Sequence, residues 1–484
     1  MKIQTMKLKN IVVTGFAAFM ALTQACTSSG YAGSNGGEVT GSSQTALREP
    51  VPYGMVLVKR GSLKIGEEGN DSLWGSNAPT KEISVESFWM DEKEVSNAKY
   101  RQFIEWVRDS IIRTRLADPA YGGDESFMIT EDKYGEPVTP HLNWTKPIPW
   151  KKANEDQQRA IESMYYRHPI TGEKMLDVKQ LNYRYELFDY TQAALRKNQL
   201  DPNDRIKNTD QEISSEKVMI SKDTAYIDEN GVIVRKTINR ELSSMYDFVN
   251  TYIVNVFPDT TCWVNDFPNA NNETYMRLYF NHPNYNDYPV VGVSWEQANA
   301  FCAWRTEYLL AGLGAQAKYI QRYRLPTEAE WEFAARGREN NRYPWKSTGS
   351  KDEDGCFYAN FKPERGNYTK DGSLITTKVG SYKPNSNGLY DMAGNVAEWT
   401  STTYTEAGIL QMNDMNPELY YNAAVEDPYY MKRKAVRGGS WKDPEKFIES
   451  SWRTYEYQNE QRSYIGFRCV RTQVGTATST KGRK

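Results

Sequence analysis

Apolar side chains recur at helical spacing shortly after residue 90. Four of them would share one face of a helix: Tyr100, Phe103, Ile104 and Val107. Ser96 or Asn97 could cap the start of this helix, because a short polar side chain accepts a hydrogen bond from a free backbone N–H group. The pattern predicts a helix within an ordered segment at about 51–110.

Two capping boxes predict further helices in a second ordered segment, at about 286–345. In a capping box, a hydroxyl residue is followed three positions later by Glu or Gln. Ser294 and Gln297 form one such pair, and Thr327 and Glu330 form another. Each pair precedes apolar residues on one helical face, namely Ala298, Phe301 and Cys302 in the first case and Trp331, Ala334 and Ala335 in the second.

The rest of the chain has a different pattern. Residues 356–473 are rich in Gly, Asn and Trp, which predicts loops and short strands. Residues 151–250 hold 16 basic and 17 acidic residues, and Asn230-Gly231 lies there between two apolar runs, which predicts a β-hairpin. We interpret about 111–284 as a long charged insertion with local structure. It is either a solvated surface elaboration or a docking surface for neighbouring subunits.

The amino-acid composition argues against several classes of function. The formal net charge of the 484 residues is −2, so the chain is not built to neutralise phosphates and no nucleic-acid partner is expected. Only three histidines occur, His141, His168 and His282, and they lie far apart in the sequence. Histidine-based catalytic and zinc motifs are therefore not expected.

The N-terminal residues are typical of a targeting segment. Residues 1–25 carry three lysines and no acid, and an apolar run from Ile11 to Leu22 is too short to span a bilayer, as is typical of a signal peptide. The run ends in LTQAC, which resembles a bacterial lipobox with Cys26 as the lipidated residue. Ordinary cleavage with Cys26 as a bystander is the alternative. Residues 26–50 are rich in Gly and Ser and are expected to form a flexible tether.

Six strings occur in a fixed order along the chain. They are 91–100 (DEKEVSNAKY), 289–295 (PVVGVSW), 324–332 (RLPTEAEWE), 388–399 (GLYDMAGNVAEW), 437–441 (RGGSW) and 466–469 (GFRC). Together they closely resemble the formylglycine-generating enzyme (sulfatase-modifying factor) family. The resemblance implies an α+β fold of the C-type-lectin-like kind with little regular secondary structure. This domain would span 51–473, with the insertion inside it and a flexible tail at 474–484.

The resemblance also implies two structural calcium sites. One would be formed by the side chains of Asp391 and Glu398 with the carbonyls of Gly394 and Val396. The other would use Asn360 and Asp371 with the carbonyls of Phe361 and Ser373. Carboxylates and carbonyls are the oxygen ligands that Ca²⁺ prefers. The alternatives are a Gly-Asn turn with a surface Glu at the first site and a loop closed only by hydrogen bonds at the second.

The positions of the cysteines bear on two questions, whether the chain is an enzyme and whether it holds a disulfide. In the family, two cysteines shortly after the RGGSW-type string bind copper and activate oxygen, and thiolates suit Cu(I). No cysteine occurs here between Trp441 and Phe467, so no copper is expected and the chain is expected not to be an enzyme. The resemblance implies a disulfide between Cys302 and Cys469, against the alternative of two buried apolar thiols. Cys262 and Cys356 either pair or stay free.

The lipobox, the tether, the missing cysteines and the insertion occur together in the lipoproteins of this family that serve the type IX secretion and gliding machinery. This resemblance implies a structural protein on the periplasmic face of the outer membrane, forming a ring with copies of itself and with a partner protein. A catalytically altered oxidase or a lectin-like periplasmic binder is the alternative. For a binder, five tryptophans either line a groove or belong to the core: Trp295, Trp331, Trp399, Trp441 and Trp452.

Overall fold

The computed structural model describes residues 51–67, 79–132, 134–201, 205, 217–313, 320–337 and 340–474. These residues belong to one compact unit that begins at Pro50. The predicted signal peptide, Cys26 and the tether lie outside the described residues, as does the tail beyond Val474.

The first of two four-stranded sheets joins the two ends of the unit. Its strands are β1 (Met55–Val58), β4 (Phe88–Asp91), β18 (Val470–Thr472) and β13 (Tyr323–Arg324), paired antiparallel in that order. Met90 of β4 lies opposite Val470 of β18, and both side chains are fully buried. The DEKEVSNAKY and GFRC strings are thereby brought side by side, because each flanks one of these two strands.

The second four-stranded sheet carries the other strings. Its order is β16 (Thr454–Tyr457), β15 (Arg433–Arg437), β14 (Ala397–Thr403) and β17 (Ile465–Gly466), with β17 parallel to β14 and the other pairs antiparallel. All seven residues of β14 are buried. A separate antiparallel pair is formed by β2 (Gly61–Ile65) and β3 (Lys81–Val85), and the segment after β14 contains the short helix α9 (Gly408–Gln411). The irregular character predicted for 356–473 is confirmed.

Three helices flank the sheets, and their predicted starts are confirmed. Ser96, not Asn97, caps α2 (Asn97–Ala117), and both capping boxes form, at α7 (Trp295–Leu313) and at α8 (Glu328–Arg336). The helices α2 and α7 pack against each other through stacked rings of Tyr100 and Phe301, with centroids 5.6 Å apart. Because α2 continues to Ala117, it runs through the boundary expected at residue 111.

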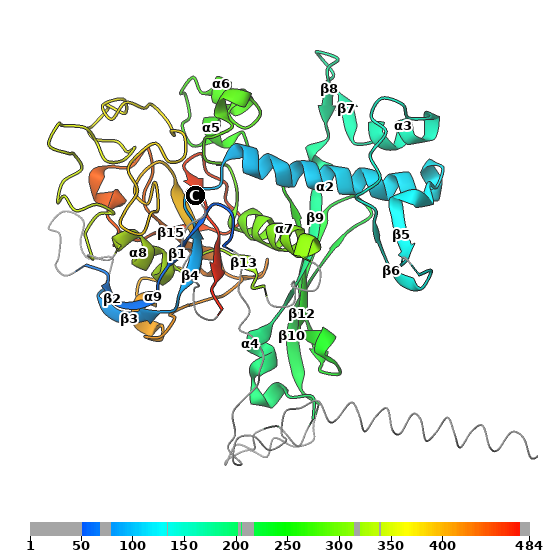
Figure 1. Cartoon of the computed structure of the whole chain (residues 1–484), viewed down its shortest axis with the longest axis horizontal. Coiled ribbons are helices and arrows are strands. Elements are labelled where there is room, and N and C mark those ends of the chain that lie inside the picture. The colour runs from blue at the N-terminus through cyan, green and yellow to red at the C-terminus, as the bar shows by residue number, and fades with distance from the viewer. Residues whose placement is uncertain are drawn as a thin grey trace, which may run out of the picture. The chain divides into compact units, whose positions relative to one another are not determined.

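Residues 111–284 are built mainly of hairpins (Figure 1). The C-terminal part of α2 contacts α3 (Glu155–Glu162) and the hairpin of β5 (Met128–Glu131) and β6 (Pro137–Leu142). The remaining elements of this region are β7 (Tyr165–Arg167), β8 (Lys174–Leu176), β9 (Asn182–Phe188), α4 (Tyr190–Ala194), β10 (Met219–Ile227), β11 (Ile233–Glu241), β12 (Val249–Asn255), α5 (Cys262–Asn265) and α6 (Glu273–Leu278). The predicted Asn230-Gly231 hairpin is confirmed, and its strands are longer than the apolar runs indicated.

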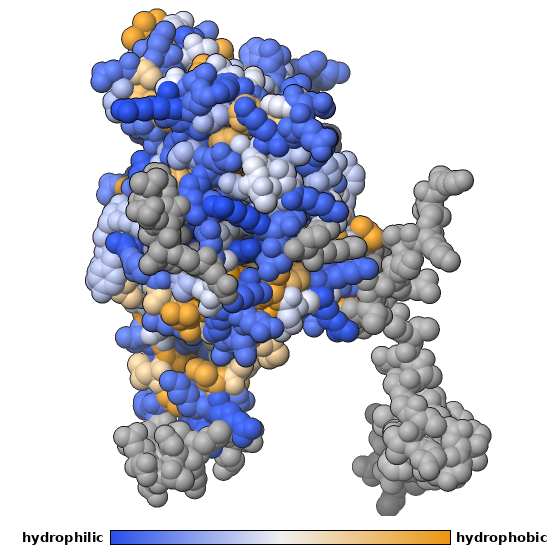
Figure 2. All heavy atoms as spheres, turned by 90° about the vertical axis from the view of Figure 1, so that its left-hand side faces the viewer, coloured by the Kyte–Doolittle hydropathy of each residue, from blue (hydrophilic) through white to orange (hydrophobic). Residues whose placement is uncertain are grey.

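The insertion packs onto the body through α7, which contacts both β9 and β12. Its surface includes large exposed apolar side chains, among them Ile170, Tyr190 and Tyr246, which are 89%, 74% and 81% exposed. The molecular face in Figure 2 is largely hydrophilic, with scattered apolar patches. Within the part of the chain that the structure describes, no helix is both long enough and apolar enough to cross a bilayer.

Candidate functional site

The RGGSW string begins at Arg437, the last residue of β15. It precedes the segment where the resemblance implies the catalytic cysteines. Gly438 and Gly439 have φ angles of 91° and 63°, and a Cβ on Gly439 would lie 2.6 Å from the carbonyl oxygen of Phe447. Asp443 accepts hydrogen bonds from the backbone and the hydroxyl of Ser440, at 3.0 and 2.7 Å, and so closes the turn that follows. The glycines and this carboxylate shape the chain without supplying a nucleophile.

A cavity of about 120 Å³ lies next to this turn. Its polar and charged lining includes Lys442, Asp443 and Glu456, and its aromatic lining includes Phe447, Trp452 and Tyr464. Neither a thiol nor an imidazole lines it. The lining therefore offers no soft ligand for copper.

Arg437, the first residue of the string, has a structural role. Its guanidinium is fully buried and pairs with Glu328 and Glu332 of α8. Arg453 binds the same Glu328 carboxylate at 2.6 Å. Burial alone would raise the pKa of Glu328, but Arg453 and Arg437 outweigh it and lower that pKa. This charge cluster fastens the RLPTEAEWE string to the second sheet, and breaking one partner of such a cluster is strongly destabilising.

Glu398, a predicted calcium ligand, is buried and bound on both oxygens. Arg468 donates to it from Nε and from a terminal nitrogen, with the shortest contact at 2.6 Å, and the Trp331 indole N–H donates at 2.8 Å. The alternative of a surface Glu is therefore wrong, since Glu398 is 1% exposed. The remaining N–H groups of Arg468 donate to the backbone carbonyls of Asp91, Glu92 and Tyr390, so all five of its donors are engaged.

Asp391, the other charged ligand predicted for this site, lies beside Glu94, which sequence reasoning did not single out. One Asp391 oxygen accepts from the backbone N–H of Gly380, and the second, Oδ1, has no hydrogen-bond donor. Glu94 accepts from the side chain of Asn395 at 3.0 Å through Oε1, and its Oε2 also lacks a donor. Glu94 is fully buried and Asp391 is 7% exposed. Glu94 Oε2 and Asp391 Oδ1 thus receive no N–H or hydroxyl donor, and the two carboxyl groups lie within hydrogen-bonding reach of each other.

The electrostatics of this carboxyl pair follow from burial. Burial, reinforced by the neighbouring Asp391, raises the pKa of Glu94 well above its usual value. Burial likewise raises the pKa of Asp391, although the Gly380 hydrogen bond, Arg468 and a side-chain hydrogen bond with Glu94 oppose the shift. Each group therefore requires a proton or a cation to offset the loss of solvation.

The backbone around the pair is held in unusual conformations. Asp391 and Asn395 have φ angles of 54° and 60°, the left-handed region that non-glycine residues rarely adopt. Gly394 has a φ of 74°, and a Cβ there would lie 2.1 Å from the carbonyl oxygen of Asn360. The GLYDMAGNVAEW string is thus folded into a tight loop, and such strain clusters at ligand sites.

The second predicted calcium site forms a closed loop. Asp371 accepts from the backbone N–H of Phe361 at 2.7 Å and from that of Ser373 at 3.1 Å. Asn360 donates to the carbonyl of Ile375 at 2.9 Å and to Asn395 Oδ1 at 3.3 Å. The four predicted residues are therefore gathered, but the Asp371 oxygens already accept from backbone donors. Asn395 links this loop to Glu94.

The Asp391 site gives the clearer fit to the calcium that the resemblance implies, and the Asp371 site stays a prediction. At Asp391 and Glu94, two acidic oxygens lack donors, as expected where a cation is held. At Asp371, hydrogen bonds satisfy the carboxylate. Within the described residues, no three His, Cys, Asp or Glu side chains are grouped as metal ligands, and Glu398 is paired with Arg468. A cation beside Asp391 would therefore need backbone carbonyls as well as the two carboxylates.

The cysteines implied to form a disulfide are close together. The sulfurs of Cys302 on α7 and Cys469 after β17 lie 3.4 Å apart, both buried, as two thiols in contact. Cys262 is buried and Cys356 is exposed, and both are free thiols. All five tryptophans considered for a groove are buried: four pack in core clusters, and Trp452 lines the cavity beside the RGGSW turn.

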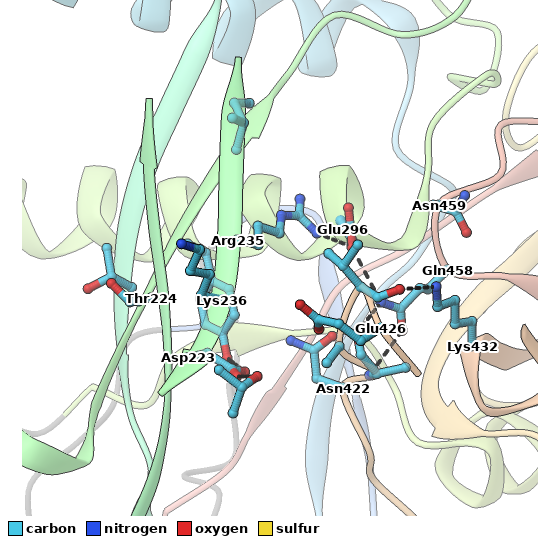
Figure 3. A pocket seen from close by; sticks show the side chains of 17 residues that line it. Asp223, Thr224, Arg235, Lys236, Glu296, Asn422, Glu426, Lys432, Gln458 and Asn459 are labelled. Atoms are coloured by element: carbon cyan, nitrogen blue, oxygen red, sulfur yellow. Dashed lines mark hydrogen bonds and ion pairs between the residues drawn. The ribbon is translucent and has the colours of Figure 1, made fainter. Parts of the chain in front are cut away.

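A separate surface pocket lies between residues 111–284 and the body (Figure 3). It measures about 340 Å³, with β10, β11 and β12 on one side and residues 422–426 and 458–459 on the other. Arg235 of β11 forms an ion pair with Glu296 of α7, and this pair also lines a neighbouring pocket of about 500 Å³. The hydrogen-bonding groups around the first pocket include Asp223, Lys236, Asn422, Glu426 and Gln458.

The sequence strings and this geometry agree with the comparisons to known proteins. A family model described as sulfatase-modifying factor enzyme 1-like domain matches residues 41–473. The chain belongs to this family, whose members include the formylglycine-generating enzymes. The α and β content of the structure agrees with that assignment.

Individual relatives match over shorter stretches. A mouse (Mus musculus) protein named inactive C-alpha-formylglycine-generating enzyme 2 is 40% identical over 122 residues, which cover 25% of this chain and 34% of the relative. Mouse formylglycine-generating enzyme is 32% identical over 199 residues, which cover 40% of this chain and 46% of the enzyme. The chain thus spans less than half the length of these relatives. The solved structure of PvdO from Pseudomonas aeruginosa aligns over 87% of this chain and 94% of PvdO, with 15% identity and a TM-score of 0.41.

Proposed function

We propose that this chain is a non-catalytic structural subunit that keeps the formylglycine-generating-enzyme fold and has lost its oxidation chemistry. One observation carries the proposal. The turn after RGGSW and its cavity are intact, but no cysteine lies between Trp441 and Phe467 and no thiol lines the cavity. Without thiolates there is neither a Cu(I) site nor a nucleophile in this place. The similarity to a relative named inactive is consistent with such a loss.

The proposed setting is the periplasmic face of the outer membrane. The signal-peptide pattern and the LTQAC string support a lipid anchor on Cys26, and the Gly/Ser-rich residues 26–50 support a tether. With the missing cysteine pair and the long insertion, these features resemble the PorK/GldK lipoprotein of the type IX secretion system and gliding machinery. The proposed task is to form a ring with copies of itself and a PorN/GldN-type partner, in contact with other secretion-system components, in support of protein export.

The insertion is the proposed docking region. Its exposed apolar side chains, including Ile170, Tyr190 and Tyr246, are available for contacts with a neighbouring subunit. Calcium beside Asp391 would have a structural role in this proposal, holding the GLYDMAGNVAEW loop, and copper has none. A lectin-like periplasmic binder, or the related GldJ lipoprotein, is the second candidate. The polar pocket beside Arg235 and Glu296 is the observation that favours a binder.

Two measurements test the proposal. Replacing Cys26→Ala should move the protein from the membrane fraction to the soluble periplasm, and retention in the outer membrane of a processed chain without lipid would exclude a lipid anchor on Cys26. Mild solubilisation of the native complex followed by mass measurement should give an assembly of many copies with a second protein. A monomer at all detergent concentrations would contradict the structural role.

Surface variants refine the docking assignment. Ile170→Ser and Tyr246→Ser remove exposed side chains from the insertion, and Tyr53→Ser removes a side chain of the body that is 92% exposed. The insertion variants should dissociate the assembly at lower detergent concentration with an unchanged monomer melting temperature. The Tyr53 control should leave the assembly intact. Equal behaviour of all three variants would place the contacts elsewhere.

A further inference from the structure

The carboxyl cluster around Asp391 holds more acidic than basic side chains. Glu94, Asp391 and Glu398 face a single guanidinium, that of Arg468, so the fully ionised cluster carries two uncompensated negative charges. Arg468 spends its donors on Glu398 and on backbone carbonyls, which leaves none for the other two carboxyl groups. The cluster is buried, so water does not screen this charge.

Other cations do not supply the missing charge. Lys93 precedes Glu94, but its ammonium lies over the ring of Tyr390, 5.2 Å from the centroid. Among the described residues, neither Lys93 nor any other lysine or arginine forms a salt bridge with Glu94 or Asp391. The amide of Asn395 satisfies one oxygen of Glu94 and carries no charge.

We infer that Glu94, rather than Glu398, supplies the second acidic ligand to a divalent cation held beside Asp391. The two carboxyl oxygens without donors, Glu94 Oε2 and Asp391 Oδ1, would bind the cation, and its two positive charges would offset the excess of the cluster. A hard cation of the Ca²⁺ class fits an all-oxygen set of two carboxylates with additional carbonyl ligands. Glu398 has a different task, because its two oxygens are held by Arg468 and Trp331.

The competing arrangement is a proton shared between Glu94 and Asp391. Sharing a proton satisfies both oxygens without a metal ion, as in other closely spaced carboxyl pairs. The two arrangements respond oppositely to a neutral side chain at position 94. A cation site loses a ligand when Glu94 becomes Gln, whereas a proton-sharing pair merely exchanges a shared proton for an amide donor.

The inference rests on the proposed calcium site. Calorimetry on the purified chain shows separately whether calcium binds and whether Glu94 is one of its ligands. The chain is stripped with EDTA and titrated with CaCl₂ in the Asp371→Asn background, which removes the only side-chain carboxylate of the other family site. The reference chain should bind one Ca²⁺. Glu94→Gln and Asp391→Asn should each weaken binding at least tenfold. Glu398→Gln should lower the melting temperature with and without calcium but retain the calcium-dependent rise.

The outcomes are distinct. If the reference chain binds neither Ca²⁺, Mg²⁺ nor Mn²⁺ at millimolar concentration, the calcium proposal and this inference both fail, and a shared proton explains the pair. If the reference chain binds Ca²⁺ and Glu94→Gln binds equally well, only the assignment of Glu94 fails. Should Glu94→Gln not fold, a crystal of the unaltered chain soaked in calcium decides the question. The anomalous peak should then lie about 2.3–2.6 Å from an oxygen of Glu94, and a peak bound by Glu398 instead would overturn the inference.

Discussion

The amide of Asn395 donates a hydrogen bond of 3.0 Å to Glu94, a residue 301 positions earlier in the chain. The same side chain accepts from the backbone N–H of Thr377 at 2.8 Å and from Asn360 at 3.3 Å. Asn395 thus connects the loop closed by Asp371 with the buried carboxyl pair. The two calcium sites that the resemblance implies are therefore joined by one hydrogen-bonded network in this chain.

Replacing Asn395→Asp should destabilise the fold. The donated hydrogen bond to Glu94 is lost and another carboxylate enters a cluster that already has excess negative charge, so we expect a loss of about 3 kcal/mol or more in the free energy of unfolding. Urea denaturation in EDTA measures it. Asn416→Asp is the matched control, since Asn416 also has a positive φ, 46°, but is exposed and accepts from the backbone N–H of Glu86. A loss of equal size in the control would contradict the argument.

Gly394 tests the tightness of the same loop. In Gly394→Ala the added Cβ would lie 2.1 Å from the Asn360 carbonyl oxygen, and the φ of 74° strains any side chain. Such a clash should lower the free energy of unfolding by about 3 kcal/mol or more. Gly349 has an ordinary φ, and a Cβ added there would meet no atom within 4 Å, so Gly349→Ala should stay within about 0.5 kcal/mol of the unaltered chain. Equal losses of stability in Gly394→Ala and Gly349→Ala would exclude the close approach of Gly394 to the Asn360 carbonyl oxygen.

The contact between Cys302 and Cys469 leads to a redox prediction. In an oxidising compartment we expect these thiols to form a disulfide, which would close a loop spanning 167 positions and add about 5 kcal/mol in the chain-entropy model. Peptide mapping of protein isolated without reductant should find the crosslinked peptides. Exposed Cys356 should react with iodoacetamide in the folded state and serves as the control for reagent access. Alkylation of both Cys302 and Cys469 after unfolding without reductant would show that they remain free.

The buried ammonium group of Lys434 should make the free energy of unfolding depend on pH. Its ammonium is buried over the ring of Trp295, 4.1 Å from the centroid, and donates to the carbonyl of Tyr421. Burial lowers the pKa of Lys434 to about 7, although Glu296 and Glu418 oppose the shift. The unfolded chain keeps a normal lysine, so it binds more protons than the folded chain above pH 7 and stability rises with pH.

The comparison with Lys434→Met isolates this effect. Between pH 7 and pH 9, the free energy of unfolding of the unaltered chain should increase by about 1–2 kcal/mol relative to the methionine variant, since each pKa unit corresponds to about 1.4 kcal/mol. Urea denaturation at both values of pH measures it. Parallel changes in the two proteins would show that the ammonium is not destabilised by burial.

Local chemistry made part of this structure predictable. The caps of α2, α7 and α8 and the Asn230-Gly231 turn depend on neighbours within a few residues, so their sequence signals were sufficient. The length of α2 was not predictable, because its second half is held by contacts with α3 and the β5–β6 hairpin. Tertiary packing decided that extension.

The candidate site was predictable only in part. The strings located Asp391 and the missing cysteines, and they also suggested Glu398 as a calcium ligand. That suggestion could not foresee Arg468, which reaches Glu398 from 70 positions away and takes up both oxygens. Glu94 was overlooked because an acidic residue after a strand is usually solvated.

A turnover assay is the sharpest test of the proposal that this chain keeps the family fold without the oxidation chemistry. The purified chain, supplied with Cu(I) under oxygen, is incubated with a cysteine-containing sulfatase-type peptide while oxygen uptake and peptide mass are followed. A non-catalytic chain should cause no oxygen uptake above the copper-only control and no conversion of cysteine to formylglycine. Peptide conversion that depends on the chain, and oxygen uptake that accompanies it, would show that the chain is an oxidase.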